Sequence, residues 1–296
     1  MNTNTDTAGL RFRKALNQNK PLQIVGTINA YTALMATKVG HQAIYISGGA
    51  CANASYGLPD LGMTSMNDVL EDARRITAVV DTPLLIDIDT GWGGSFNIAR
   101  TIKESIRAGV AAVHMEDQVS QKRCGHRPNK EVVSTDEMVD RIKAAVDART
   151  DDDFFIMART DSYAIEGLQA SIDRAGAYME AGADGIFAEA MATLEEYKAY
   201  DEQIDAPLLA NMTEFGMSPL FDKQELADNG VNMVLYPLTA TRAMNKAAEM
   251  VYQDVLEKGH QKDMVEHMQT RMELYDYLNY HEYEQTLDKL FSEGKS

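Results

Sequence analysis

Two stretches of the chain follow one pattern: AGVAAVHME at residues 108–116 and AGADGIFAE at residues 181–189. In each, a glycine follows a helical segment, a short apolar run comes next, and a glutamate stands seven residues after the glycine. The same spacing separates two further pairs, Gly40 and Ser47, and Gly230 and Pro237. Because a glycine in the left-handed conformation commonly ends a helix, the pattern predicts repeated helix–strand units whose seventh residue emerges at the end of a strand.

Short apolar runs of this kind recur along most of the chain, and segments with helical spacing, such as 96–108 and 168–181, separate most of them. We expect strands at 22–28, 43–47, 83–89, 110–116, 154–159, 184–189, 207–211 and 231–236. Nearly continuous apolar runs are typical of parallel strands buried on both faces. Alternating strand and helix patterns indicate an α/β protein, and eight strands favour a closed (β/α)8 TIM-type barrel over an open sheet.

The residues that end these strands carry most of the polar chemistry. Barrel enzymes place their sites at the C-terminal ends of the strands. The pattern therefore nominates a set of rim residues before any family is considered: Ser47, Asp87, Asp89, Glu116, Arg159, Glu189 and Asn211.

The chain is strongly acidic, with 296 residues, 28 Lys and Arg, 45 Asp and Glu, and a formal net charge of −17. This acidity disfavours nucleic acid as a partner and disfavours anionic membranes. No run approaches the roughly 18–20 apolar residues of a membrane span, and residues 1–9 resemble neither a secretory signal nor a transit peptide. Because Cys51 and Cys124 are the only cysteines, a disulfide framework is excluded, and we expect a cytoplasmic protein.

We expect one barrel domain over residues 1–296, of which roughly 243–296 form a helical C-terminal extension. Residues 242–257 and 264–290 carry apolar side chains at intervals of three and four residues, which predicts helices. The last stretch is rich in tyrosine: Tyr275, Tyr277, Tyr280 and Tyr283. So many aromatic side chains favour packing on a partner subunit, and composition therefore favours an oligomer.

Asp87 and Asp89 end the third expected strand, and Glu116 and Asp117 end the fourth. Alternate residues of a strand face the same side, so both aspartates would point into the barrel mouth. A divalent cation with oxygen ligands relieves the repulsion between them. A rim site with few ligands favours Mg2+ over zinc, which prefers Cys and His. The alternative is that these acids cap helices or form salt bridges.

The segment KRCGHRP at residues 122–128 places four potential cations around one thiol, that of Cys124, in a loop marked by Gly and Pro. Cations lower the pKa of a thiol and make it reactive, so we expect Cys124 to take part in chemistry. A solvated basic loop is the alternative. Cys51, in a stretch of small residues, is expected to be a packing residue, and His114, inside a strand, a core histidine.

Anion binding is indicated by a second group of residues. Ser47-Gly48-Gly49 ends the second expected strand, and adjacent glycines let backbone N–H groups approach an anion closely; a simple turn is the alternative. Arg159, Arg242 and Arg271 are each typical of surface ion pairs when taken singly. Together, in so acidic a chain, they favour a polyanionic substrate held by local guanidinium groups. No serine-hydrolase or nucleotide-binding motif is present.

Four motifs occur together: SGG at 47–49, DID at 87–89, EDQ at 116–118 and KRCGH at 122–126. In this combination the chain resembles the isocitrate lyase/phosphoenolpyruvate mutase superfamily. The resemblance extends over nearly the whole chain through KRCGHRPN at 122–129, IMARTD at 156–161, NMTEFG at 211–216 and YPLTATR at 236–242. The thiol loop is specific to lyases, since mutases and decarboxylases of the superfamily lack its cysteine.

The resemblance implies a (β/α)8 barrel whose last helix is exchanged between subunits, in a homotetramer built as a dimer of dimers. It also implies Mg2+, for which Mn2+ can substitute, near Asp87 and Asp89, held mostly through water, with Asp60 and Glu116 close by. It assigns substrate contacts to Ser47, Gly48, Gly49, Cys124, Gly125, Arg159, Glu189, Asn211, Met212, Thr213, Arg242 and Arg271.

The implied reaction is a retro-aldol (Claisen-type) cleavage of the tricarboxylate 2-methylisocitrate to pyruvate and succinate, in propionate catabolism by the methylcitrate cycle. Cys124 is expected to protonate the succinate carbon as general acid, and Arg159 and His126 to stabilise the dianion together with the metal. Tyr45 and a rim carboxylate are both candidates for the base. The alternatives are an isocitrate lyase, a mutase or decarboxylase of 2-oxo acids, and a barrel that only binds a dicarboxylate or a partner.

Overall fold

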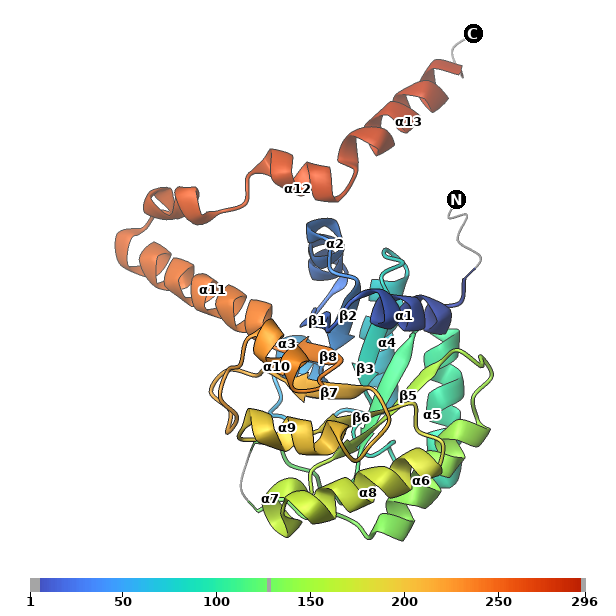
Figure 1. Cartoon of the computed structure of the whole chain (residues 1–296). Helices are drawn as coiled ribbons and strands as arrows, with labels where there is room; N and C mark the ends of the chain where they lie inside the picture. Colours follow the sequence, from blue (N-terminus) through green and yellow to red (C-terminus); the bar gives the residue numbers. More distant parts are fainter. Residues whose placement is uncertain (1–5, 127–128, 294–296) are drawn as a thin grey trace. The chain divides into compact units, whose positions relative to one another are not determined.

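The structure is a computed structural model that describes residues 6–126 and 129–293. Eight parallel strands close into a barrel in sequence order (Figure 1). They are β1 (Leu22–Gly26), β2 (Ala43–Ile46), β3 (Leu84–Asp87), β4 (Ala112–Glu116), β5 (Phe155–Thr160), β6 (Gly185–Ala188), β7 (Leu208–Asn211) and β8 (Met233–Tyr236). The predicted (β/α)8 barrel is confirmed. Each strand lies within its expected range, except that β5 extends one residue further, to Thr160.

Helices connect the strands and surround the barrel (Figure 1). They are α2 (Ala30–Val39), α3 (Gly48–Tyr56), α4 (Met66–Thr77), α5 (Ser95–Arg107), α6 (Thr135–Asp147), α7 (Tyr163–Glu166), α8 (Leu168–Glu180), α9 (Leu194–Asp201) and α10 (Lys223–Asp228). The glycines of the repeated pattern have the predicted left-handed conformation, with φ of 110° at Gly40, 77° at Gly109, 102° at Gly182 and 85° at Gly230. Each therefore turns the chain from a helix into the next strand.

Alternate residues of the strands form two separate apolar layers. Ile86 and Ala158 pack in the layer that includes residues of the surrounding helices, whereas the residues before them, Leu85 and Met157, belong to the cluster inside the barrel. Side chains alternate along a strand, so the residue two places after each interior residue also faces inward, at the C-terminal rim. By this count, five interior residues are each followed on the inner face by a rim residue: Tyr45 by Ser47, Leu85 by Asp87, Met157 by Arg159, Phe187 by Glu189 and Leu209 by Asn211.

Helix α1 (Ala8–Gln18) covers the opposite end of the barrel. The ring centroid of Phe12 lies 5.2 Å from that of Phe155, the first residue of β5. Gly9 allows this close approach, because a Cβ atom there would lie 2.4 Å from the backbone carbonyl carbon of Asp153. The apolar interior is thus closed at the N-terminal end and bordered by polar groups at the C-terminal rim.

The chain divides into two compact units, Met1–Thr241 and Arg242–Ser296. The second unit contains most of α11 (Thr239–Lys258), the 3-10 helix η1 (Lys262–His267), α12 (Arg271–Tyr277) and α13 (Tyr280–Glu293). The prediction of helix over 264–290 is only partly right, because Thr270 forms a capping box with Glu273 and begins a new helix there. Throughout the described part of the chain, every helix is too short or too polar to cross a bilayer.

Candidate active site

Three aspartates lie against the N-terminus of α3, whose first residues are Gly48 and Gly49. The backbone N–H of Gly48 donates to Oδ2 of Asp87 at 3.2 Å. A Cβ atom at Gly48 would lie 3.1 Å from that oxygen and 3.2 Å from Asp89 Oδ1, and one at Gly49 would lie 3.0 Å from Asp60 Oδ2. The two glycines therefore let the positive end of the helix approach the carboxylates closely.

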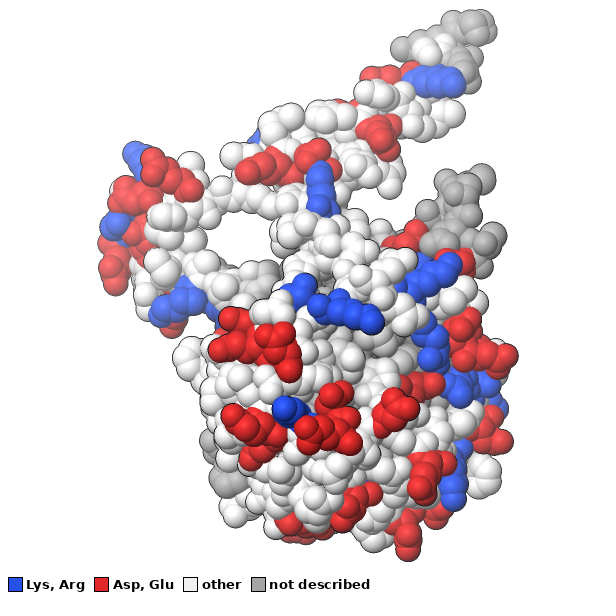
Figure 2. Space-filling view, in the orientation of Figure 1, with Lys and Arg blue, Asp and Glu red and all other residues white. Residues whose placement is uncertain are grey.

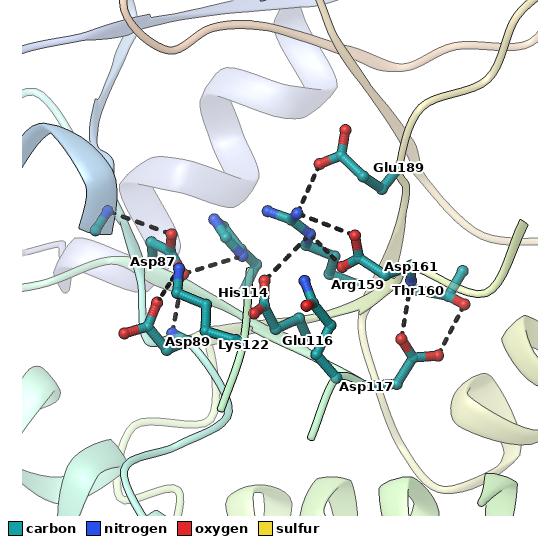
Figure 3. Close-up of polar contacts among 12 residues, drawn as sticks. Asp87, Asp89, His114, Glu116, Asp117, Lys122, Arg159, Thr160, Asp161 and Glu189 are labelled. Carbon is teal, nitrogen blue, oxygen red and sulfur yellow. Dashed lines mark hydrogen bonds and ion pairs between the residues drawn. The ribbon is translucent and has the colours of Figure 1, made fainter. Parts of the chain in front are cut away.

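Lys122 is the counter-ion of these aspartates, which the sequence did not predict. Its Nζ lies 2.5 Å from Asp89 Oδ1 (Figure 3) and 3.0 Å from Asp60 Oδ1. Burial raises the pKa of Asp89, and the charge of Asp87 raises it further, to about 6. Burial also acts to raise the pKa of Asp87, but His114, Lys122 and Arg159 outweigh it and lower the pKa to about 2. The pair thus carries negative charge at neutral pH.

Glu116 adds an unsatisfied carboxylate to this acidic cluster. It is 1% exposed, and neither of its carboxylate oxygens has a hydrogen-bond partner among the described residues, although Nε of Arg159 lies 3.4 Å away. Burial raises the pKa of Glu116 well above its ordinary value. A hard cation, or water bound to it, satisfies such oxygens. Among the described residues, no three His, Cys, Asp or Glu side chains lie close enough together to hold an ion by themselves.

Tyr45 and His114 lie inside the barrel, below the aspartates. Oη of Tyr45 lies 2.8 Å from Nε2 of His114. Nδ1 of His114 lies 3.8 Å from Asp87 Oδ1 (Figure 3). His114 is fully buried, as expected of a core histidine, yet it has these two polar neighbours. Burial lowers the pKa of His114 to about 4 and raises the pKa of Tyr45 well above its ordinary value. At neutral pH the phenol is therefore protonated and the imidazole is neutral.

Arg159 is surrounded by carboxylates at the centre of the rim (Figure 3). Its Nε lies 2.9 Å from Asp161 Oδ2, and its Nη2 lies 2.9 Å from Glu189 Oε2. Burial acts to lower the pKa of Arg159, but Asp161, Glu189 and Glu116 together raise it well above its ordinary value. The guanidinium is consequently a fixed positive charge with a defined orientation.

The thiol loop reaches the same rim through His126. Nε2 of His126 lies 2.8 Å from Glu189 Oε1, and Nδ1 accepts the backbone N–H of Met217 at 3.0 Å. Gly125 permits this approach, because a Cβ atom there would overlap Nη2 of Arg159 and lie 2.7 Å from Cγ of Glu189. The last residues of the predicted basic motif, 127 and 128, lie outside the described residues.

The expectation that the loop cations lower the pKa of Cys124 is wrong. Burial raises the pKa of this thiol, and the nearby carboxylate of Asp60 contributes in the same direction. The cations do not offset this, because Lys122 pairs with Asp89 and His126 contacts a carboxylate of its own. Cys124 therefore carries its proton at neutral pH. Cys51 is buried, as expected of a packing residue, and burial with Asp72 raises its pKa to about 12.

Asn211 ends β7 beside this group. Its Nδ2 lies 3.4 Å from both carboxylate oxygens of Glu189, while its Oδ1 is buried without a hydrogen-bond partner among the described residues. Met212 and Thr213 follow it and are also buried. Two of the predicted substrate contacts, Arg242 and Arg271, belong to the second unit, and all of the predicted substrate contacts stay predictions.

A closed barrel whose rim carries an aspartate cluster, a thiol loop and a buried arginine defines the class: the chain belongs to the phosphoenolpyruvate phosphomutase family, which it matches over residues 12–256. It is 67% identical, over 98% of its length and 100% of the other chain, to the 2-methylisocitrate lyase of Shewanella oneidensis. The resemblance stated from the motifs is thereby confirmed.

Solved structures agree with this family assignment. The chain is similar to 2,3-dimethylmalate lyase, a member of the PEP mutase/isocitrate lyase superfamily, with a TM-score of 0.88, 33% identity and coverage of 96% and 95% of the two chains. It is also similar to a phosphonopyruvate hydrolase in complex with oxalate and Mg2+, with a TM-score of 0.84, 28% identity and coverage of 95% and 98%.

Proposed function

We propose that this chain is a carbon–carbon lyase that cleaves 2-methylisocitrate to pyruvate and succinate, as part of propionate catabolism by the methylcitrate cycle. The observation that carries the proposal is the place of the Cys124 thiol, on a loop whose His126 contacts Glu189 at the same rim as Arg159. The near full-length similarity to a 2-methylisocitrate lyase supports the choice of substrate.

A tricarboxylate must approach this rim against the formal net charge of −17 that the chain carries. Acidic side chains are spread over the visible face of the molecule, with fewer basic ones among them (Figure 2). The local positive charge of Arg159 and the backbone N–H groups of Ser47-Gly48-Gly49 other than the one that Gly48 donates to Asp87 are what would receive the substrate carboxylates. The other proposed substrate contacts are Cys124, Gly125, Glu189, Asn211, Met212, Thr213, Arg242 and Arg271.

Asp87 and Asp89 would hold Mg2+, or Mn2+ in its place, with Asp60 and Glu116 close by. The orphaned oxygens of Glu116 and the negative charge of the aspartate pair support this assignment. When bound, the ion supplies positive charge beside the reacting oxygens of the substrate.

The chain's own residues then move two protons. A base takes the proton of the tertiary hydroxyl, the carbon–carbon bond breaks as the carbonyl of pyruvate forms, and the electron pair passes to the succinate carbon. Arg159 and His126 stabilise the resulting dianion, and Cys124 gives its proton to that carbon. Tyr45 and a rim carboxylate are the two candidates for the base; the raised pKa of Tyr45 and the lowered pKa of its neighbour His114 keep the phenol protonated and favour the carboxylate.

A coupled assay tests the proposal. The chain is incubated with 2-methylisocitrate, with isocitrate or with oxaloacetate, with and without EDTA, and pyruvate and succinate are quantified. We expect pyruvate from 2-methylisocitrate and loss of activity in EDTA. Because one methyl group accounts for only ~1–3 kcal/mol of discrimination, isocitrate should be cleaved slowly. Faster cleavage of isocitrate, or pyruvate formed only from oxaloacetate, would contradict the proposal.

We also propose that the chain works in the cytoplasm as a homotetramer, a dimer of dimers that exchanges its last barrel helix between subunits. Supporting this, the helices of the second unit carry exposed apolar side chains, with Tyr283 75%, Leu290 63% and Phe291 64% exposed. Such a surface is typical of a protein interface. Light scattering should give about four times the 32.8 kDa chain mass, and a monomer would contradict the assembly.

A further inference from the structure

Asp161 has no exposed side-chain surface and accepts from two cations at once. Its Oδ2 accepts Nε of Arg159 at 2.9 Å, and its Oδ1 accepts Nη2 of Arg159 at 3.3 Å and Nζ of Lys130 at 2.8 Å. The backbone N–H of Asp161 is itself fixed, donating to Asp117 Oδ1 at 2.8 Å (Figure 3). The orientation of the guanidinium thus depends on a carboxylate whose own position is set on two sides.

The charges around Arg159 give Lys130 a role of its own. Asp161, Glu189 and Glu116 all face this one guanidinium. The side chain of Lys130 is only 2% exposed and ends on Asp161. Because Lys130 neutralises Asp161, a larger share of the charge of Arg159 stays available to an anionic ligand. Without it, a buried carboxylate would be compensated by Arg159 alone.

Lys130 also comes from the base of the thiol loop rather than from its tip. The backbone N–H of Val119 donates to the carbonyl of Glu131 at 3.0 Å, and that of Val133 donates to the carbonyl of Asp117 at 2.8 Å. These bonds close the two ends of the loop on each other. The ion pair therefore joins a fixed segment of the loop to the arginine at the rim.

We propose that Lys130 and Asp161 are positioning residues for Arg159: Asp161 orients the guanidinium, and Lys130 keeps Asp161 from neutralising it. Neither residue was nominated from the sequence, and neither needs to touch the substrate. The inference deepens the proposed lyase function and rests on it, because Arg159 is the group through which both residues act.

The test compares Lys130→Met and Lys130→Arg with the parent and with Lys143→Met, a matched change at an exposed lysine of α6. For each, kcat and KM for 2-methylisocitrate and the melting temperature are measured. We expect Lys130→Met to lower kcat/KM ~10–100-fold, largely through KM, because a charged hydrogen bond acting through Arg159 is lost. Lys130→Arg should recover most of the loss, and Lys143→Met should match the parent.

Two further variants separate positioning from a structural role. In an Arg159→Lys background, Lys130→Met should lower kcat/KM by less than ~3-fold, because the two changes remove one shared interaction. The double variant Lys130→Gln/Asp161→Asn removes both charges together, so it should fold, yet still lose at least ~10-fold in kcat/KM.

The outcomes are distinct. A parent enzyme that does not cleave 2-methylisocitrate contradicts the proposed function. A parent that cleaves it, with Lys130→Met lowering only the melting temperature, or with a fully active double variant, overturns the positioning role and leaves the function standing. An equal loss of kcat/KM from Lys130→Met in the parent and in the Arg159→Lys background would also overturn the positioning role.

Discussion

Nε2 of His126 lies 2.8 Å from Oε1 of Glu189, while Oε2 of the same carboxylate lies 2.9 Å from Nη2 of Arg159. One glutamate at the end of β6 therefore holds both the thiol loop and the guanidinium. Because Glu189 is 1% exposed, water does not replace either contact. The position of the proton donor and the position of the anion-binding group are coupled through this side chain.

Replacing Glu189 by Gln should lower kcat/KM ~10–100-fold, because the neutral amide no longer pairs with Arg159 and the loss of one partner of a buried ion pair is costly. Steady-state kinetics with 2-methylisocitrate measure the loss. Glu180→Gln, at an exposed position of α8, is the matched control and should match the parent. A Glu189→Gln enzyme with parental kinetics would show that His126 needs no carboxylate partner.

Replacing Cys124 by Ser should leave the melting temperature and Mg2+ binding unchanged while lowering kcat by ~10²–10⁴-fold, the usual contribution of a general acid. Calorimetry reports the folding and the metal, and the pyruvate assay reports the turnover. Substantial turnover in this variant would mean that another group protonates the succinate carbon.

The raised pKa of Cys124 predicts the pH dependence of its alkylation. Burial disfavours the thiolate, so less of it is present at neutral pH than for an ordinary thiol, whose pKa is about 8.5. The rate of reaction with iodoacetamide should therefore rise with pH through a midpoint above that value.

The control for this experiment is Cys124→Ser, which retains Cys51. Because burial raises the pKa of Cys51 to about 12, the variant should take up no label over the same pH range. A midpoint below that of an ordinary thiol would mean that the loop cations dominate after all.

Replacing Gly125 by Ala tests the close approach of the thiol loop to the rim. The added methyl group would overlap Arg159 and Glu189; overpacking of this kind costs about 1–3 kcal/mol, so kcat/KM should fall ~10–100-fold. Gly94→Ala is the control, because a Cβ atom at Gly94 meets no atom within 4 Å and its φ is −75°. Equal activity of both variants would show that the loop works at a distance from Arg159.

Replacing Phe12 by Ala should destabilise the barrel without changing its chemistry. The fully buried ring closes the end opposite the site, and its removal should lower the free energy of unfolding by about 3–5 kcal/mol. Urea unfolding measures this, and kcat at 25 °C should be unaffected. Val39→Ala, at a 72% exposed position, should change stability by less than about 0.5 kcal/mol.

The strands and the rim could be predicted because both depend on local rules. Apolar runs mark strands that are buried on both faces, and a left-handed glycine fixes where β2, β4, β6 and β8 start, which in turn fixes which residue ends each of them. Glu116 and Glu189 follow directly from that count. The family motifs then assigned chemistry to positions that the periodicity had already placed at the rim.

The partners of the charged groups could not be predicted, because they depend on the register of the closed barrel and on the path of the thiol loop. Lys122 lies two residues from Cys124 in sequence but pairs with Asp89 and Asp60, and the expected effect on the thiol was therefore wrong. A weaker sequence signal existed for two other residues: His114 stands two places before Glu116, and Asp161 two places after Arg159, so each shares a strand face with a rim residue.

On each strand, the rim residue belongs to the alternate residues that face the barrel interior. This arrangement limits which changes in the strand sequences preserve the site. A substitution at Asp87 or Glu189 alters the C-terminal rim and leaves the apolar cluster inside the barrel intact. Deleting one residue earlier in β3, by contrast, would bring Ile88 to the inner face and turn the aspartate toward the helices, because the pleat has a period of two. The active-site chemistry of this barrel can therefore change through substitutions at the C-terminal ends of the strands. Insertions or deletions within the strands would instead disrupt the site.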